Sequence, residues 1–166
     1  KLPNGATLST MPDNQFGSVL MEDVQRIAEA EGIQSYNITT ATFAVNPYNF
    51  KRIEDSEADQ YNDPQAVTLR GNLNMEKDKD VLKGNLELKE GRWGNEKDLN
   101  VCVISDEIAQ MNNLSIGDKL EFNDYKDREN SNVYTAEIIG IYLNAKSIDA
   151  LMPGDTYRGE NIIFTD

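Results

Sequence analysis

Three pairs of neighbouring carboxylates come nearest, by residue type and spacing, to catalytic chemistry. The pairs are Asp78 with Asp80, Asp106 with Glu107, and Glu54 with Asp55. Two carboxyl groups can act as a general acid and a general base when their surroundings push their pKa values apart. Each pair lies in a polar segment, and adjacent residues of a helix or strand point in different directions. We therefore expect all three pairs to lie on solvated faces without a catalytic role.

The sequence contains few other residues that could form a catalytic or metal site. The chain has no histidine, which removes the commonest general base and zinc ligand and every Ser-His or Cys-His pair. The single cysteine, Cys102, lies in an apolar run and is predicted to be a small buried hydrophobe. An EF-hand loop starting at Asp78 would have Lys83 where glycine is required, and the polar segment after Asn123 also lacks that glycine. We expect no catalytic residue, metal site or cofactor.

The charge of the chain limits its partners. With 16 basic and 29 acidic residues, the formal net charge is −13 at pH 7. Such a field repels phosphate backbones and anionic lipid surfaces, so no nucleic-acid partner is expected. No apolar run approaches the roughly 20 residues that span a bilayer. The abrupt start at Lys1 and the strand pattern in residues 162–166 predict a fragment excised from a longer protein.

Helix and strand patterns alternate along the chain. Apolar residues at helical spacing predict a helix over 20–31, which ends before Gly32. A second, two-turn helix is expected to start at a Ser105 cap, with Ile108 and Met111 facing inward. A Gly117-Asp118 turn precedes the strand at 119–122. A strand rich in β-branched and aromatic residues is predicted at 35–45, and further extended segments are predicted at 65–73, 86–93, 99–104 and 133–143.

Aromatic side chains in two polar segments are candidates for contact with a partner. Three belong to the long excursion at 48–64 and one to the polar tip at 123–132; they are Tyr48, Phe50, Tyr61 and Tyr125. Aromatic residues are enriched among those that dominate binding energy at interfaces. The alternative is that they pack over the core of their own domain.

The stretch 84–122 carries a recognisable order of motifs. Leu88-Lys89-Glu90-Gly91-Arg92-Trp93 precedes a variable loop, residues 103–109 read Val-Ile-Ser-Asp-Glu-Ile-Ala, and a Gly-Asp turn follows in 114–120. This order resembles the MacB-like core domain, the large extracytoplasmic domain of MacB/FtsX-type ABC transporter permeases. The strand at 133–143 and the helix before Gly32 also fit, so the resemblance covers residues 19–143.

The resemblance implies an α+β fold of two lobes. A porter-like α+β lobe would comprise residues 1–75 and 145–166, and an inserted, mostly β, sabre-like lobe would comprise residues 76–144. The motifs that match the family imply structural roles, with Gly91 and Gly117 in turns and Ser105 as a helix cap. No catalytic residue is implied, because ATP hydrolysis in the family belongs to a separate cytoplasmic subunit.

The resemblance also implies a function and partners. The chain would be the extracellular domain of a permease subunit at the cell membrane. It would couple cytoplasmic ATP hydrolysis to conformational work or to binding outside the cell, without being an enzyme. Its expected partners are the transmembrane segments of the same permease, the cytoplasmic ATPase acting through the membrane, and an accessory extracytoplasmic protein or peptide. The high Asn, Lys and acidic content favours a low-GC Gram-positive bacterium as source.

Two other functions stay open at this point. The chain could be a stand-alone cell-surface binding module, which a parent with one wall or lipid anchor would indicate. It could also be a carboxylate-based hydrolase, which would need two carboxyl groups roughly 5–9.5 Å apart on facing elements.

Overall fold

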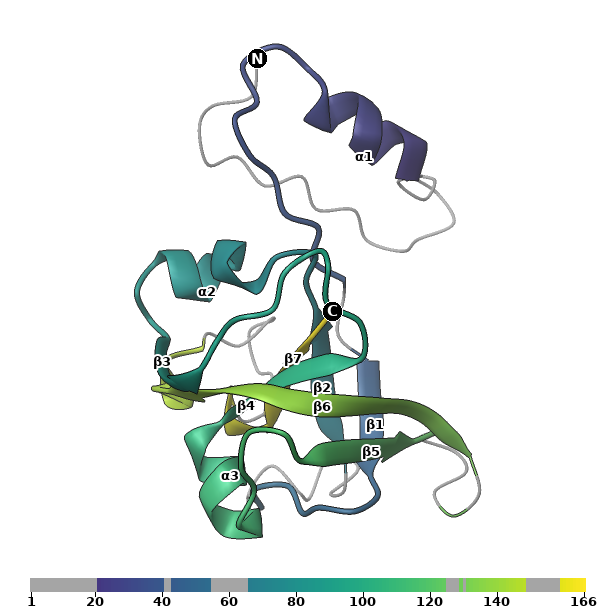
Figure 1. Cartoon of the computed structure of the whole chain (residues 1–166), viewed down its shortest axis with the longest axis vertical. Helices are drawn as coiled ribbons and strands as arrows, with labels where there is room; N and C mark the ends of the chain where they lie inside the picture. Colours follow the sequence, from purple (N-terminus) through teal and green to yellow (C-terminus); the bar gives the residue numbers. More distant parts are fainter. Residues whose placement is uncertain (1–20, 41–42, 55–65, 125–128, 130, 149–158) are drawn as a thin grey trace. The chain divides into compact units, whose positions relative to one another are not determined.

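A computed structural model describes residues 21–40, 43–54, 66–124, 129, 131–148 and 159–166. The chain divides into two units, residues 1–36 and 37–166. In the first unit the described element is α1, Met21–Ala28 (Figure 1). Glu22 and Asp23 in its first turn complement the positive end of the helix dipole. The predicted helix is confirmed, although it ends three residues earlier than the predicted end at 31.

The second unit is built around one mixed sheet. Its strands are β1 Phe43–Pro47, β2 Val67–Gly71, β3 Glu87–Gly91, β4 Val101–Ser105, β5 Lys119–Asn123, β6 Asn132–Leu143 and β7 Ile162–Thr165. Its helices are α2 Lys79–Leu82, α3 Asp106–Asn112 and the 3₁₀ helices η2 Met75–Lys77, η3 Ala145–Ser147 and η4 Gly159–Asn161. The sheet order is β3-β6-β4-β7-β2-β1-β5, and β5 also pairs with β6. This last pairing closes six strands into a barrel and leaves β3 outside the ring (Figure 1).

The two-lobe α+β prediction is wrong, because strands from both predicted lobes belong to the same closed sheet. β1, β2 and β7 come from the ranges 1–75 and 145–166, whereas β3 to β6 come from 76–144. β7 joins the two sets, since it pairs parallel to β2 and antiparallel to β4. The charged segment near residue 76 therefore connects strands of one barrel and is not the boundary of a second lobe.

The predicted strand at 35–45 begins later than expected. Residues 35–40 make only one isolated bridge, from Thr39 to Asn72, and the strand starts at Phe43. The Asn37 side chain donates to Asn72 Oδ1 at 2.8 Å and accepts from the Asn74 amide at 2.9 Å. Such side-chain bonds give the backbone an alternative to a regular ladder.

β6 is the strand on which the sheet depends. Its residues 132–137 pair with β5 and its residues 140–143 pair with β3 along one edge, while β4 pairs along the other edge. Two glycines permit the close approach of β3. A Cβ on Gly140 would lie 2.4 Å from the Arg92 carbonyl oxygen, and one on Gly91 would lie 2.2 Å from that of Ile139. Gly91 also has a φ of +77°, which favours glycine.

Alternating side chains of β5 and β6 fill the barrel. Leu120 and Phe122 on β5 and Ala136 and Ile138 on β6 are all buried in one cluster, as the alternation predicts for β5. Cys102 on β4 is fully buried in the same cluster, which confirms its expected role as a hydrophobe. A second cluster includes Tyr142, Phe164 and Trp93, whose rings pack with centroids 5.4–6.1 Å apart.

The Ser105 cap of α3 is confirmed. Its Oγ accepts from the Ile108 amide at 3.2 Å and donates to the Glu160 carbonyl oxygen at 2.7 Å, so it also ties α3 to η4. The expected inward pair is half right, because Ile108 is buried but Met111 is exposed. Ala109 is buried in place of Met111. The buried face of this short helix is therefore formed by Ile108 and Ala109 and not by the predicted pair.

The prediction that Asp78 and Asp80 are solvated is wrong. Both are buried beside Arg70 of β2, whose Nη1 lies 2.8 Å from Asp80 Oδ2 and 3.5 Å from Asp78 Oδ1. Asp78 also caps α2 by accepting from the Asp80 amide at 2.9 Å. The guanidinium lies over the Phe164 ring at 5.4 Å. This buried ion cluster attaches α2 to the barrel wall.

Replacing Arg70 by methionine should destabilise the barrel strongly. The change leaves two buried carboxylates without their cation, and breaking a buried pair in this way costs about 3–5 kcal/mol. The free energy of unfolding from urea titration measures the effect. The matched control is Lys89→Met, which removes the Lys89–Asp106 pair at 2.6 Å, where the lysine is 44% exposed. An exposed pair contributes about 0–1 kcal/mol. Equal losses in the two variants would contradict a structural role for the buried cluster.

Candidate binding groove

Among the described residues with catalytic potential, Asp78 and Asp80 lie together, and both face the Arg70 guanidinium. No three histidine, cysteine, aspartate or glutamate side chains gather as a metal site within the described parts of the chain. Asp106 bonds Lys89 and Gln110 at the surface, and Glu54 is exposed, whereas Asp55 lies outside the described residues. Burial raises the pKa of the Cys102 thiol, with a smaller contribution from the Asp166 carboxylate. The thiol is therefore neutral and shielded, unlike a catalytic thiolate.

The four aromatic candidates for partner contact have different locations. Phe50 is 7% exposed and packs edge-to-face on Phe122 with ring centroids 5.6 Å apart, so it belongs to the core. Tyr48 is 58% exposed, and its place at a partner surface stays a prediction. Tyr61 and Tyr125 lie outside the described residues.

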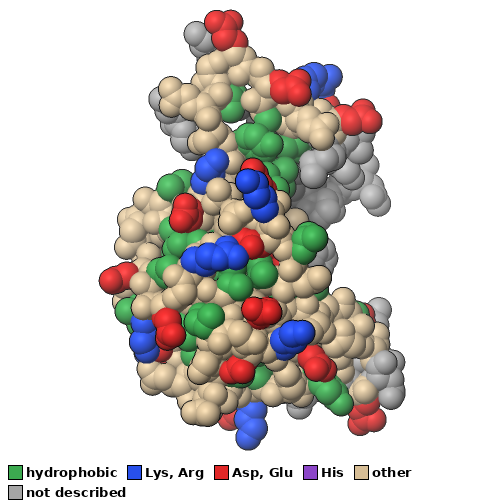
Figure 2. Space-filling view, in the orientation of Figure 1, with side chains coloured by type: hydrophobic (Ala, Val, Ile, Leu, Met, Phe, Trp, Pro, Cys, Tyr) green, Lys and Arg blue, Asp and Glu red, His purple; other side chains and the backbone are tan. Residues whose placement is uncertain are grey.

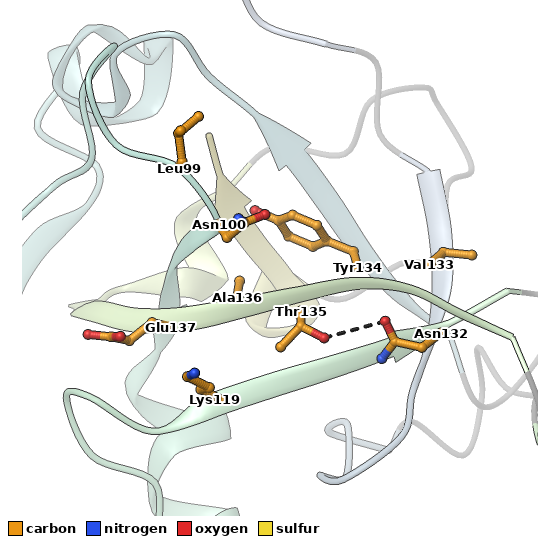
Figure 3. Close-up of a pocket in the computed structure, with 9 residues that line it drawn as sticks. All are labelled: Leu99, Asn100, Lys119, Asn132, Val133, Tyr134, Thr135, Ala136 and Glu137. Atoms are coloured by element: carbon orange, nitrogen blue, oxygen red, sulfur yellow. Dashed lines mark hydrogen bonds between the residues drawn. The ribbon is translucent and has the colours of Figure 1, made fainter.

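A groove of about 510 Å³ opens in the barrel wall between the start of β4 and the first half of β6 (Figure 3). Its lining residues come from three segments of the chain. They are Leu99, Asn100, Lys119, Asn132, Val133, Tyr134, Thr135, Ala136 and Glu137. No sequence motif had indicated this site.

The groove exists because β6 is longer than the strand beside it. β4 begins at Val101, which pairs with Glu137, while β6 extends back to Asn132. Among the described residues, the segment 132–136 therefore has β5 on one edge and no strand in register on the other. In the predicted elements the only signal was that the strand at 133–143 is longer than the strand at 99–104.

The open edge presents main-chain hydrogen-bonding groups. The Glu137 amide donates to the Asn100 carbonyl oxygen at 2.9 Å, which shows that Glu137 faces the β4 side. Because backbone groups alternate along a strand, the N–H and C=O of Thr135 point the same way, into the groove. Among the described residues, no hydrogen-bond partner meets them there. The Thr135 hydroxyl makes a long contact of 3.4 Å to Asn132 Oδ1 (Figure 3).

Tyr134 and Asp166 fix the inner wall of the groove. In Figure 3 the Tyr134 ring extends from β6 toward Asn100. Its hydroxyl donates to Asp166 Oδ1 at 2.6 Å, and the same carboxylate accepts from the amides of Asn100 at 3.1 Å and Val101 at 2.9 Å. Burial, with this hydrogen bond to Asp166, raises the pKa of the Tyr134 phenol. The phenol therefore keeps its proton and remains a hydrogen-bond donor at neutral pH.

The outer rim is apolar at two points and charged between them. Leu99 is 80% exposed and Val133 is 50% exposed. Lys119 of β5 and Glu137 of β6 are paired in register beside the groove. The rim thus offers apolar contact area together with one group of each charge sign.

An ion pair holds the loop that leads to Leu99. Arg92 donates through both terminal nitrogens to Asp98, at 2.6 and 2.7 Å, and the Asn95 amide donates to Asp98 Oδ2 at 2.9 Å. The hydrogen bond from Arg92 is the main cause that lowers the pKa of Asp98 to about 2. Two-point pairing of this kind fixes geometry as well as charge.

Comparison with known proteins finds a distant similarity to a permease. No protein-family model matches the chain. The chain is 25% identical over 154 residues to an uncharacterized ABC transporter permease, YclI, of Bacillus subtilis (strain 168). The match covers 79% of this chain but only 31% of the relative. This chain is similar to part of an ABC transporter permease. The match supports the permease part of the predicted resemblance, whereas membership of the MacB-like core domain stays a prediction.

The secondary structure adds one observation on membranes. Within the described ranges, no helix combines the length and apolar character needed to cross a bilayer.

The Arg92–Asp98 pair predicts a specific acid titration. Because the folded pKa of Asp98 is lowered from 3.8 to about 2, its stabilising contribution is present above pH 4 and is lost as the pH falls toward 2. Carboxyl carbon NMR should give a midpoint near 2 for Asp98. In the Arg92→Ala variant this midpoint should rise toward 3.8. Arg92→Lys, which keeps the charge but not the two-point bond, should give an intermediate value. An unchanged midpoint in Arg92→Ala would contradict the assigned cause.

Proposed function

We propose that this chain is an extracellular domain of an ABC transporter permease, which couples ATP hydrolysis on the cytoplasmic side to conformational work or partner binding outside the cell. The observation that carries the proposal is the match to a Bacillus subtilis permease across 79% of the chain. Because the chain corresponds to 31% of that relative, the transmembrane and coupling parts of the mechanism belong to the proposal. The motif order at 84–122 supports a domain related to the MacB/FtsX type.

The domain is proposed to work without catalytic chemistry. Arg70 pairs with the buried Asp78 and Asp80, and Asp106 pairs with Lys89. The thiol of Cys102 is buried with a raised pKa. Hydrolysis needs a free acid and a free base whose pKa values differ. The groups named here are instead buried or paired in the structure.

A closed barrel suits a part that transmits movement. Every strand of the ring is hydrogen-bonded on both sides over part of its length, so displacement of one strand displaces its neighbours. Coupling between distant sites needs packed elements that move as bodies. The partners in this proposal are the transmembrane segments of the same permease, the cytoplasmic ATPase acting through the membrane, and an accessory extracytoplasmic protein or peptide. The permease relative supports an association with a membrane, and the cell membrane of a Gram-positive bacterium is part of the proposal.

Cysteine accessibility in intact cells tests the location. The full-length natural gene product, carrying Lys97→Cys on the exposed 95–98 turn, is treated with a membrane-impermeant maleimide. We expect labelling without permeabilisation, because the proposal places this turn outside the cell. The unsubstituted protein is the matched control, since its buried Cys102 should stay unlabelled until the protein is denatured. Labelling of the Lys97→Cys variant only after the cells are permeabilised would refute the extracellular placement.

A further inference from the structure

We propose that the groove beside β6 binds an extended, basic and apolar segment of a partner protein, which adds a strand to the open edge at residues 132–136. The unpaired main chain of Thr135, the exposed apolar rim and the negative charge of this domain carry the inference. It concerns an interaction surface of the folded barrel and does not depend on where the protein is located.

Thr135 presents main-chain hydrogen-bonding groups to the groove. The N–H and C=O of Thr135 face the groove. Thr135 lies two residues before Glu137, whose amide makes the first hydrogen bond of β6 to the β4 side, at Asn100. An open strand edge is a template for another extended chain, and strand addition of this kind supplies affinity through backbone hydrogen bonds. The N–H and C=O of one strand residue are the pair of groups that a neighbouring strand matches, so the geometry favours a polypeptide.

The space and the rim fit one added strand. An incoming strand lies about 4.8 Å from its neighbour, and this position beside residues 132–136 falls within the groove of about 510 Å³. Its alternate side chains would contact Val133 on one side and Leu99 on the other (Figure 3). Covering these side chains, which are 50% and 80% exposed, removes apolar area from water.

Charge decides between a second copy and a different protein. The chain carries a net charge of −13, so two copies repel each other as they approach. Acidic and basic side chains are intermixed on the face shown in Figure 2, which therefore offers no large positive patch to attract an acidic partner. Glu137 and Lys119 line the groove with one charge of each sign, so the choice of a basic segment rests on the net charge of the chain. A segment with lysine or arginine at alternate positions complements this environment.

The groove is ordered before any partner binds. Asp166 holds the amides of Asn100 and Val101 and the Tyr134 hydroxyl, and the Arg92–Asp98 pair holds the preceding loop. A binding site that is already in its bound geometry loses less conformational entropy on association.

The experiment uses the 166-residue chain and a synthetic probe. The probe is a fluorescein-labelled peptide of about nine residues in which lysine and valine alternate between terminal threonines. Fluorescence anisotropy measures its affinity, and amide NMR shifts locate its contacts. We expect saturable binding with the largest shifts at residues 132–137.

The decisive variant is Thr135→Pro. Proline removes the N–H that points into the groove, while the ladder to β5 is formed through Tyr134 and Ala136 and stays intact. We expect the affinity to fall about tenfold or more. The matched control is Thr135→Ala, which keeps the N–H and should bind as the unsubstituted protein does. Thermal unfolding of both variants verifies that the barrel is folded.

Modified probes test the unsubstituted protein, so the result does not depend on the folding of a variant. Two probes carry N-methyl groups on alternate amides, one on the odd and one on the even positions, and both keep their side chains. The probe whose methyl groups lie on the edge that faces β6 cannot pair through its main chain and should lose binding. A peptide with glutamate in place of lysine should bind more weakly.

Three results would overturn the proposal. One is absence of saturable binding by the lysine-valine peptide. The second is equal affinity of Thr135→Pro and Thr135→Ala together with equal affinity of the N-methylated probes, which would indicate contact through charge alone. The third is self-association of the chain in sedimentation experiments that Thr135→Pro abolishes, which would assign the edge to a second copy.

Discussion

The length of β6 is the constraint on which the rest of the structure depends. β6 has 12 residues, whereas its three partners β3, β4 and β5 have five each. It therefore pairs with two strands in succession along one edge, and the contact with β5 closes the ring. In the part of the chain that the structure describes, the same excess length leaves residues 132–136 without a paired strand on the other edge. Closure of the barrel and the opening of the groove thus have one physical cause.

The buried ion cluster is the second determinant of the architecture, because it attaches the segment before β3 to β2. A buried pair of charges gains little net stability once desolvation is counted, but an alternative packing that separates the partners leaves a buried charge unpaired. Arg70 and Asp80 therefore act against alternatives in which residues 76–83 leave the barrel. The predicted boundary between two lobes fell at residue 76, yet in the structure this segment is one of the places where separation of two lobes would be most costly.

Local sequence patterns predicted local structure well. They did not predict contacts between residues that are far apart in the sequence. The Ser105 cap, the alternation of Leu120 and Phe122 and the long strand β6 each depend on neighbouring residues, and all are present. The burial of Asp80 depends on Arg70, ten residues away, and on the ring of Phe164. Insertion of β7 between β4 and β2 joins the end of the chain to its middle, which no local signal encodes. The groove arises from the relative lengths of paired strands, so it became visible only with their register.

Natural β-proteins protect open edges, and the edge beside the groove has some of these features. A bulge at Val133 interrupts the register with β5, and Glu137 places a charge next to the edge. Both devices discourage indiscriminate pairing. Protection of a free edge usually adds lysine, proline or a covering loop on the edge itself, whereas residues 132–136 are Asn-Val-Tyr-Thr-Ala and the nearby Leu99 is exposed. An edge with partial protection and an exposed apolar rim excludes most extended chains and admits a complementary one, which is the behaviour of a selective docking site.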